Sequence, residues 1–283
     1  MTNLNPIQVV FIGGGNMGRA MIGGLIKNGV DPQLITAVDP QPETIKKLAT
    51  DLSVKTFGSI TGAEQELNHA QVIVLAVKPQ DFQTAAKQLS SVLKKRASSQ
   101  PVILSIAAGI QTSDMSKWLE YQTCVRAMPN TPALINQGIT GLFAPTYVNS
   151  NQRQLAQAIC SAVGKVVWIN DESLMDSVTA LSGSGPAYVF AFLEALQASG
   201  EQMGLPTEVA RELAYQTLMG AAALALQSSE SPTTLRQKVT SKGGTTAAAL
   251  AVLEKNNWSA ILQEALTAAR KRGAEMAKEL GNS

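Results

Sequence analysis

The feature that most constrains the fold of this chain is a glycine-rich segment that directly follows a short apolar run. The apolar residues 9–12 lead into GGGNMG, which gives the spacing Gly13-x-Gly15-x-x-Gly18. Glycines at this spacing allow a tight turn and a close approach of a pyrophosphate, and the N-terminus of the following helix donates amide groups to it. In this strand–turn–helix context the segment predicts a dinucleotide-binding loop. The alternative is a glycine-rich turn that holds no ligand.

Short runs rich in Val, Ile and Leu alternate with helical patterns up to about residue 168. The predicted strands cover residues 7–13, 34–39, 71–77, 101–107, 123–129 and 165–170. The predicted helices between them cover residues 16–28, 42–50, 81–95 and 151–163. Nearly continuous apolar strands are typical of a parallel sheet that is covered on both faces. We therefore predict an α/β fold with an N-terminal Rossmann-type doubly wound sheet.

The second half of the chain has no strand pattern. Helices are predicted over residues 173–200, 207–228, 232–240, 245–255 and 258–280. We predict a dinucleotide-binding domain over residues 1–168 and an all-helical dimerisation and substrate domain over residues 169–283. An alanine-rich helical surface that exposes apolar side chains requires a partner, so we expect self-association.

The segment SGSGP at 182–186 interrupts the first of these helices, because Pro186 disfavours helical geometry in the preceding Gly185. We favour a kink that lets two subunits pack, since the helix that follows is nearly all apolar. The alternative is that Gly183, Gly185 and Pro186 shape the floor of a pocket.

Asp39 ends the second predicted strand, about 20 residues after Gly18, where a ribose-binding acid is expected. A carboxylate accepts hydrogen bonds from a free 2′-hydroxyl and repels a 2′-phosphate. The following PQPETIKK contains no Arg, and Lys46 and Lys47 come late, so electrostatics favour NADH. The alternative is that Asp39 only initiates the turn DPQP.

Ligands of an open α/β sheet lie outside the carboxyl ends of its strands, which draws attention to two further segments. These are LAVKPQ at 75–80 and RAMPNTPA at 126–133. Lys78 is also compatible with a plain surface lysine, and the second segment with a sharp connector instead of a nicotinamide-side wall. The residues expected to bind the cofactor are Gly13, Gly15, Asn16, Met17, Gly18, Asp39, Ala76, Val77, Lys78, Pro79 and Asn130.

Composition excludes several other function classes. The net charge is +2 without a basic block, which does not favour nucleic acid or an anionic membrane as a partner. Cys124 and Cys160 have no metal-ligand spacing, so we expect no metal and a reducing compartment. The N-terminus does not resemble a signal peptide, and no run is long enough to span a membrane. We expect a cytoplasmic location.

The sequence does not favour a reaction that needs a strong acid or base from the protein. His69 is the only histidine and is expected at the surface, which excludes a Ser-His-Asp triad and a histidine-based dehydrogenase mechanism. The carboxylates are scattered. Hydride transfer to an acceptor that is already activated, such as a protonated imine, fits these residues best.

A second glycine loop, KVTSKGGTT at 238–246, precedes an alanine-rich helix. Together with VFIGGGNMGRAMIGGL, LAVKPQ, RAMPNTPA and TALSGSGPAYVFAFLEAL, the block LRQKVTSKGGTTAAALAVLE resembles pyrroline-5-carboxylate reductase, the enzyme of the last step of proline synthesis. The resemblance spans roughly residues 7–275, and the last block is its most specific motif.

The resemblance implies reduction of L-1-pyrroline-5-carboxylate to L-proline by NADPH or NADH. It also implies a homodimer, with dimers building into rings such as decamers, and an active site that uses both chains. The residues it assigns to substrate binding are Ser241, Gly243, Gly244, Thr245 and Thr246. Backbone amides around Gly243 to Thr245 would receive the carboxylate, and the Thr246 hydroxyl, the catalytic candidate, would meet the imine nitrogen.

Lys242 departs from the family pattern, which has proline at this place in the loop. Lysine loosens the loop and adds a positive charge near the carboxylate site. Without the resemblance, 241–246 could be an N-cap loop between two helices. Two rival functions fit the sequence less well. A β-hydroxyacid dehydrogenase or related imine reductase would need a lysine within 173–200, which has none, and a nucleotide sensor would need no carboxylate pocket.

Overall fold

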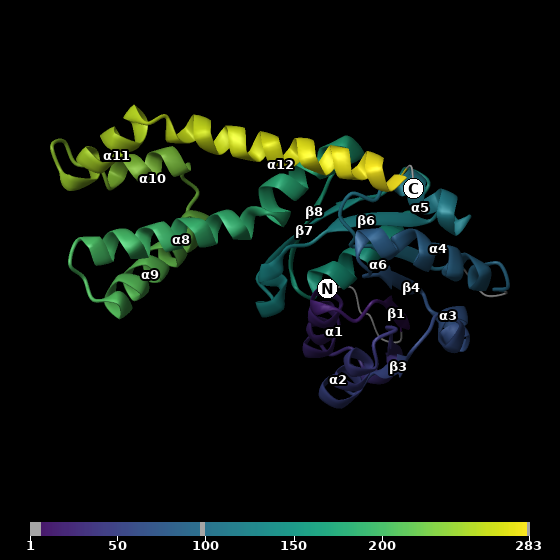
Figure 1. Cartoon of the computed structure of the whole chain (residues 1–283). Coiled ribbons are helices and arrows are strands. Elements are labelled where there is room, and N and C mark those ends of the chain that lie inside the picture. Colours follow the sequence, from purple (N-terminus) through teal and green to yellow (C-terminus); the bar gives the residue numbers. More distant parts are fainter. Residues whose placement is uncertain (1–6, 97–99, 282–283) are drawn as a thin grey trace. The chain divides into compact units, whose positions relative to one another are not determined.

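A computed structural model describes residues 7–96 and 100–281 of the chain. Within them the chain forms two compact units (Figure 1). The first contains the described residues up to Ser184 and those from Ala269 onward, and the second contains Gly185–Ala268. The first unit extends to Ser184 because the segment after β8 packs on the sheet, and the domain boundary at residue 168 stays a prediction.

The first unit is built on a sheet that has eight strands in the described residues, in the order β3-β2-β1-β4-β5-β6-β7-β8. All neighbouring strands are parallel except β6 and β7, which are antiparallel. The strands are β1 (Val9–Ile12), β2 (Ile35–Val38), β3 (Lys55–Phe57), β4 (Val72–Leu75), β5 (Val102–Ser105), β6 (Cys124–Met128), β7 (Gly138–Phe143) and β8 (Gly164–Trp168). The predicted Rossmann-type sheet is confirmed.

Helices cover both faces of this sheet. They are α1 (Asn16–Lys27), α2 (Pro42–Leu52), α3 (Glu64–His69), α4 (Pro79–Leu93), α5 (Thr112–Leu119), α6 (Ser150–Ser161) and α7 (Met175–Val178). Single helical turns add η1 (Pro32–Leu34), η2 (Thr61–Ala63), η3 (Thr131–Ile135), η4 (Glu172–Leu174) and the π-helical η5 (Thr179–Gly183).

The buried core consists of two layers, one on each face of the sheet. Along β1, Val9 and Phe11 belong to the layer under α1, α2 and α6, whereas Val10 and Ile12 belong to the layer under α3, α4 and α5. Successive side chains of a strand point to opposite faces, so a strand buried on both sides must be apolar throughout. This is why the apolar runs predicted the central strands correctly.

Four short elements were not predicted: β3, α3, α5 and β7. The reason is clearest for β7, whose sequence GITGLF contains two glycines where a strand pattern expects β-branched residues. A Cβ at Gly138 would lie 3.0 Å from atoms of Ala133, and one at Gly141 would lie 2.6 Å from the Val178 side chain. Packing against η3 and α7 therefore requires glycine in this strand.

The second unit is helical in the described residues. It contains α8 (Gly185–Gln202), α9 (Thr207–Gln227), α10 (Pro232–Lys238), α11 (Thr245–Lys255) and the first part of α12 (Trp258–Gly281). One helix was expected over 173–200, but the structure has η4, α7 and η5 before α8. The structure interrupts the helical segment at Ser184, between η5 and α8, but Gly185 is the first residue of α8 with Pro186 in its first turn, so the expected loss of helical geometry at Gly185 is not seen.

A buried ion cluster of Arg126, Glu172 and Asp176 connects η4 and α7 to the sheet. The side chain of Arg126 on β6 is only 3% exposed and lies 3.2 Å from the Asp176 carboxylate and 3.6 Å from the Glu172 carboxylate. Glu172 also accepts hydrogen bonds from the backbone N–H of Thr112 at 2.8 Å and from its hydroxyl at 2.5 Å. The cluster joins segments that lie far apart in the sequence.

We predict that Arg126→Met lowers the free energy of unfolding by about 3–5 kcal/mol, because removal of one partner leaves buried charges uncompensated. The matched control is Lys94→Met, which removes an exposed ion pair with Glu120 (side chains 57% and 62% exposed) and should cost less than about 1 kcal/mol. Urea unfolding of both variants measures the difference. Equal, small losses would show that the cluster does not stabilise the fold.

Candidate functional site

The predicted dinucleotide loop lies at the carboxyl end of β1, where the order of the strands reverses. The chain runs from β1 outward to β2 and β3 and then returns to β4 on the other side of β1. Such a switch point is where ligands of open α/β sheets bind. The glycine loop therefore occupies the place at which this fold forms a crevice.

The three fingerprint glycines have different structural roles. Gly13 has φ +104°, and a Cβ there would lie 2.5 Å from the Ala76 carbonyl oxygen. A Cβ at Gly18 would lie 2.5 Å from the Gly13 carbonyl oxygen. Gly15 is exposed, and a Cβ there would meet nothing within 4 Å. The fold itself thus requires Gly13 and Gly18, whereas the open space at Gly15 is room for a ligand.

The helix α1 begins with free donors. Gly15 is its N-cap, no side chain caps it, and its first turn contains no acidic residue. The first amides of a helix have no partner within the helix, and together with the helix dipole they favour a bound anion. The backbone amides of Asn16, Met17 and Gly18 are therefore suited to hold the pyrophosphate of a dinucleotide.

Asp39, half-buried after β2, holds the glycine loop in place. Its Oδ2 accepts a hydrogen bond from the Gly14 N–H at 2.8 Å, and its Oδ1 accepts one from the Gln41 N–H at 2.9 Å. The bond to Gln41 is the one expected of a residue that initiates a turn. The bond to Gly14 has no counterpart in the fingerprint, and sequence reasoning did not single out Gly14.

The residues after β4 border the same crevice. Ala76 donates its N–H to the Ile12 carbonyl oxygen at 2.7 Å, which places it beside the glycine loop. Ala76 and Val77 are half-buried, whereas Lys78 is exposed and is the N-cap residue before Pro79, the first residue of α4. The exposure of Lys78 agrees with a surface lysine, and its contact with a cofactor stays a prediction.

Asn130 follows β6 and lies at the start of the connection between β6 and β7. Its Oδ1 accepts a hydrogen bond from the Ile139 N–H of β7 at 2.9 Å, and it is the N-cap of η3. The side chain is thus engaged in the turn between β6 and β7, as expected of a sharp connector. Its place beside a nicotinamide stays a prediction.

The second glycine loop lies in the second unit, between α10 and α11. Gly243 has φ +74°, and a Cβ at Gly244 would overlap the Ser241 hydroxyl. Gly244 is the N-cap of α11, which has no side-chain cap and no acidic residue in its first turn. The loop therefore forms the N-cap of α11, which was the alternative to a substrate site. It nevertheless leaves the first amides of α11 available to an anion.

The side chains of this loop are accessible. Ser241, Lys242 and Thr245 are exposed, and Thr246 is half-buried. Within the described part of the chain, the hydroxyls of Ser241 and Thr246 have no hydrogen-bond partner. Polar groups without internal partners beside a helix N-terminus can bind a small anionic ligand.

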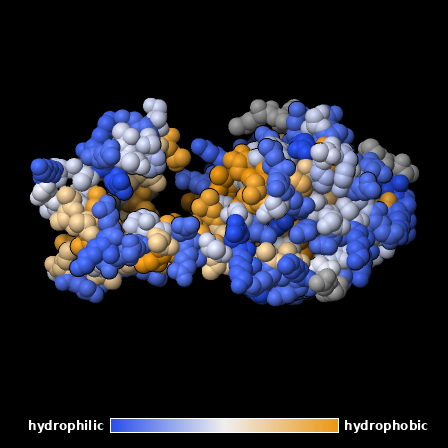
Figure 2. Space-filling view, turned by 90° about the horizontal axis from the view of Figure 1, so that it is seen from above, coloured by the Kyte–Doolittle hydropathy of each residue, from blue (hydrophilic) through white to orange (hydrophobic). Residues whose placement is uncertain are grey.

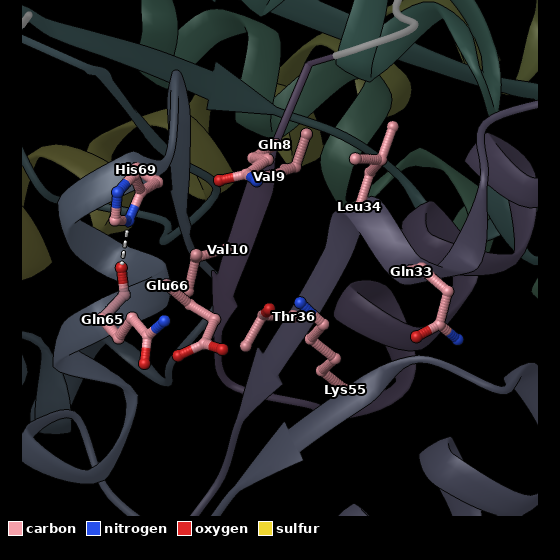
Figure 3. Close-up of a pocket in the computed structure, with 10 residues that line it drawn as sticks. All are labelled: Gln8, Val9, Val10, Gln33, Leu34, Thr36, Lys55, Gln65, Glu66 and His69. Carbon is pink, nitrogen blue, oxygen red and sulfur yellow. Dashed lines mark hydrogen bonds between the residues drawn. The ribbon is translucent and has the colours of Figure 1, made fainter.

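Other candidate groups lie elsewhere. His69 is exposed, as predicted, and its Nδ1 lies 2.8 Å from the Gln65 carbonyl oxygen. It borders a polar hollow of about 70 Å³ with Gln8, Thr36 and Lys55 (Figure 3). This hollow lies at the amino ends of the strands, away from the glycine loop.

Burial raises the pKa of Cys124 and of Cys160 to about 12, so neither thiol is a nucleophile near neutral pH. In residues 7–96 and 100–281, no group of three or more His, Cys, Asp and Glu side chains could hold a metal ion. No helix in this part of the chain is long and apolar enough to cross a membrane.

The second unit exposes many large apolar side chains, and orange and tan patches lie among hydrophilic residues at the left of Figure 2. Leu226 is 76% exposed and Met219 is 61% exposed. The other exposed large apolar residues of helices α8, α9, α11 and α12 include Val189, Phe190, Phe192, Leu213, Tyr215, Leu224, Val252, Leu253, Ile261 and Leu262. An apolar surface of this extent is typical of an interface between subunits.

Comparison with known proteins shows which family this chain belongs to. The chain is 42% identical to pyrroline-5-carboxylate reductase of Pseudomonas aeruginosa over 97% of this chain and 98% of the relative. This chain belongs to the pyrroline-5-carboxylate reductase family. The reductase of Haemophilus influenzae is also 42% identical, over 95% of this chain and 97% of the relative.

Two family models match separate parts of the chain, and each part contains one of the two glycine loops. A model for pyrroline-5-carboxylate reductase dimerisation matches residues 172–276, and a model for coenzyme F420-dependent NADP oxidoreductases matches residues 8–109. The dimerisation region and the exposed apolar side chains together identify a homo-oligomer.

Solved structures of the family superpose over almost the whole chain. The pyrroline-5-carboxylate reductase from Coxiella burnetii has 41% identity and a TM-score of 0.89, covering 96% of this chain and 99% of that one. The enzyme from Plasmodium falciparum, solved with NADP bound, has 28% identity and a TM-score of 0.83, covering 96% and 98%. A nicotinamide cofactor therefore accords with the family as well as with the loop at Gly13–Gly18.

Two glycine substitutions should separate folding from cofactor binding. Gly15→Ala places a methyl group in open space, so the thermal unfolding temperature should change little while the Kd for the reduced cofactor rises at least about tenfold. Gly13→Ala forces a Cβ against the Ala76 carbonyl and should lower the unfolding temperature. Calorimetry and cofactor fluorescence measure the two effects. Unchanged cofactor affinity in Gly15→Ala would mean that no ligand approaches this glycine.

Proposed function

We propose that this chain reduces L-1-pyrroline-5-carboxylate to L-proline with NADPH or NADH, the last step of proline biosynthesis. The observation that carries the proposal is 42% identity over almost the full length of a reductase with this substrate in its name. A dinucleotide loop alone would not suffice, because many dehydrogenases share it. The second glycine loop supports the same conclusion, since a small carboxylate needs a site of its own.

The reaction needs little acid–base chemistry from the protein. A bound nicotinamide would supply a hydride to C5 of the substrate ring, so that the C=N bond becomes a single bond while the ring nitrogen keeps its proton. The chain has to hold the two reactants in line and exclude water. This demand suits a protein whose only histidine lies at its surface and whose thiols are buried.

We assign cofactor binding to Gly13, Gly15, Asn16, Met17 and Gly18, with the pyrophosphate at the N-terminus of α1. The segments Asp39, Ala76–Pro79 and Asn130 complete the proposed cofactor site. The start of α1 supports this assignment, because no side chain of the described residues caps its first amides.

We assign substrate binding to Ser241, Gly243, Gly244, Thr245 and Thr246. The first amides of α11 would receive the carboxylate, and Lys242 adds a positive charge beside them. The Thr246 hydroxyl would accept a hydrogen bond from the protonated ring nitrogen and so fix the face of the ring. The free hydroxyls and the uncapped start of α11 support this assignment.

In the proposed assembly, residues 169–283 form the dimerisation and substrate part, and two subunits together complete each active site. Dimers would associate further, to a decamer. We also propose that the enzyme works in the cytoplasm on a small molecule, without a nucleic acid or membrane partner. The large exposed apolar side chains of α8 and α9 support the pairing of subunits.

Turnover distinguishes this function from the rivals. The purified protein with L-1-pyrroline-5-carboxylate should oxidise a reduced nicotinamide cofactor and form proline, which mass spectrometry detects. Cofactor binding without oxidation would indicate a nucleotide sensor instead.

Thr246→Ala should lower kcat about 10- to 100-fold, the range for one lost hydrogen bond to a charged group. The cofactor Kd should stay within about twofold of the wild-type value. The control is Thr267→Ala on α12, whose hydroxyl donates a hydrogen bond to the Gln263 carbonyl oxygen at 2.7 Å and which should retain full activity. Loss confined to cofactor binding would contradict the assignment.

Lys242→Gln should raise the KM for the substrate a few-fold at low ionic strength, because it removes a positive charge near the carboxylate. The effect should shrink in high salt, which screens exposed charges. Lys255→Gln, at the other end of α11, is the matched control and should leave KM unchanged. An effect of Lys242→Gln that does not depend on salt would point to loop flexibility instead of charge.

A further inference from the structure

We propose that Asp39 acts as an immobilised carboxylate that selects NADH over NADPH. This inference rests on the cofactor role of the glycine loop in the proposed function, but not on the identity of the substrate. It concerns the adenosine end of the cofactor, and the family structure from Plasmodium falciparum was solved with NADP bound.

The carboxylate of Asp39 is fixed from both sides. The Gly14 N–H donates to Oδ2 at 2.8 Å and the Gln41 N–H donates to Oδ1 at 2.9 Å. The backbone is held as well, since the Asp39 N–H donates to the Phe57 carbonyl oxygen at 3.1 Å. Turning the carboxylate away would break both side-chain bonds and leave the amide of the buried Gly14 without a partner, which is costly.

The fixed charge lies where the cofactor's ribose is expected. Asp39 follows β2, and the loop crosses beside it because the Gly13 N–H donates to the Val38 carbonyl oxygen at 2.7 Å. An acid at the end of this strand faces the 2′-position of the adenosine ribose. Each carboxylate oxygen retains an acceptor site, which can take a hydrogen bond from the 2′-hydroxyl of NADH.

The Asp39 carboxylate would repel the 2′-phosphate of NADPH. This phosphate carries negative charge and has no free donor, so it needs basic partners and a carboxylate that can move aside. Asp39 is held by two backbone donors and does not move aside. The adjoining first turn of α2 adds a second acid, Glu43.

No basic residue directly follows Asp39 to hold a 2′-phosphate. Arg19, on α1, forms an ion pair with Asp51 on α2, with an N–O distance of 2.6 Å. Residues 39–45 contain no Lys or Arg, and Lys46 and Lys47 follow only in the second turn of α2. Lys55 begins β3 and points into the hollow at the amino end of the sheet (Figure 3).

Equilibrium binding tests the proposal without turnover. The Kd values of NADH and NADPH are measured by cofactor fluorescence on the full-length protein and on Asp39→Asn, Asp39→Ser and Glu43→Gln. The wild-type protein should bind NADH at least about tenfold more tightly than NADPH. Asp39→Asn, which keeps an oxygen for the Gly14 N–H but no charge, should bring the two Kd values within about threefold, and Asp39→Ser should do the same.

Glu43→Gln is the control variant, because it removes a nearby negative charge that is not hydrogen-bonded to the glycine loop. It should keep the preference for NADH. Combining Asp39→Ser with Gln41→Arg should reverse the preference. Tighter binding of NADPH by the wild-type protein would overturn the proposal. So would equal weakening of both cofactors in the Asp39 variants, because Asp39 would then only hold the loop. Absence of proline formation would refute the proposed function and leave this result intact.

Discussion

The close approach of the glycine loop to its two neighbouring strands is the constraint on which this molecule depends. Gly13 bonds to β2 through the Val38 carbonyl oxygen, while its α-carbon lies so close to the Ala76 carbonyl that no side chain fits. Both contacts require β1 to pair in register with β2 and β4, as Ile12 does with Val38 and Leu75. The apolar core that aligns these strands thus also fixes the loop that is built to hold a dinucleotide.

A helix with an uncapped N-terminus after a glycine loop occurs twice in the described residues. Both α1 and α11 begin after a glycine N-cap, without a side-chain cap and without an acidic residue in the first turn. Each leaves its first amides to an external anion, in keeping with a pyrophosphate at one helix and a small carboxylate at the other. The two helices lie in different compact units, and the exposed apolar surface of the second unit requires a partner subunit. Oligomerisation and substrate binding are therefore linked in the proposed enzyme.

Elements with a strong local pattern could be predicted from the sequence, and contacts between distant residues could not. The apolar runs of β1, β4 and β5 and the fingerprint Gly13-x-Gly15-x-x-Gly18 predicted the central sheet and its loop. Strand β7 was missed because packing on Ala133 and Val178 requires its glycines. The contact of Asp39 with Gly14 and the cluster around Arg126 join residues whose separation carries no motif. Whether Asp39 is a turn residue or a ribose ligand could not be decided from spacing; its hydrogen bond with the Gln41 N–H supports the turn role, and the ribose contact stays a prediction.

The most direct test of this account is a crystal structure of the assembled protein with NAD⁺ and proline bound. We expect the pyrophosphate on the amides of Asn16–Gly18, the proline carboxylate on the first amides of α11, and C4 of the nicotinamide about 3–3.5 Å from C5 of the ring. Proline bound anywhere other than at residues 241–246, or a dinucleotide away from the loop at Gly13–Gly18, would contradict the account.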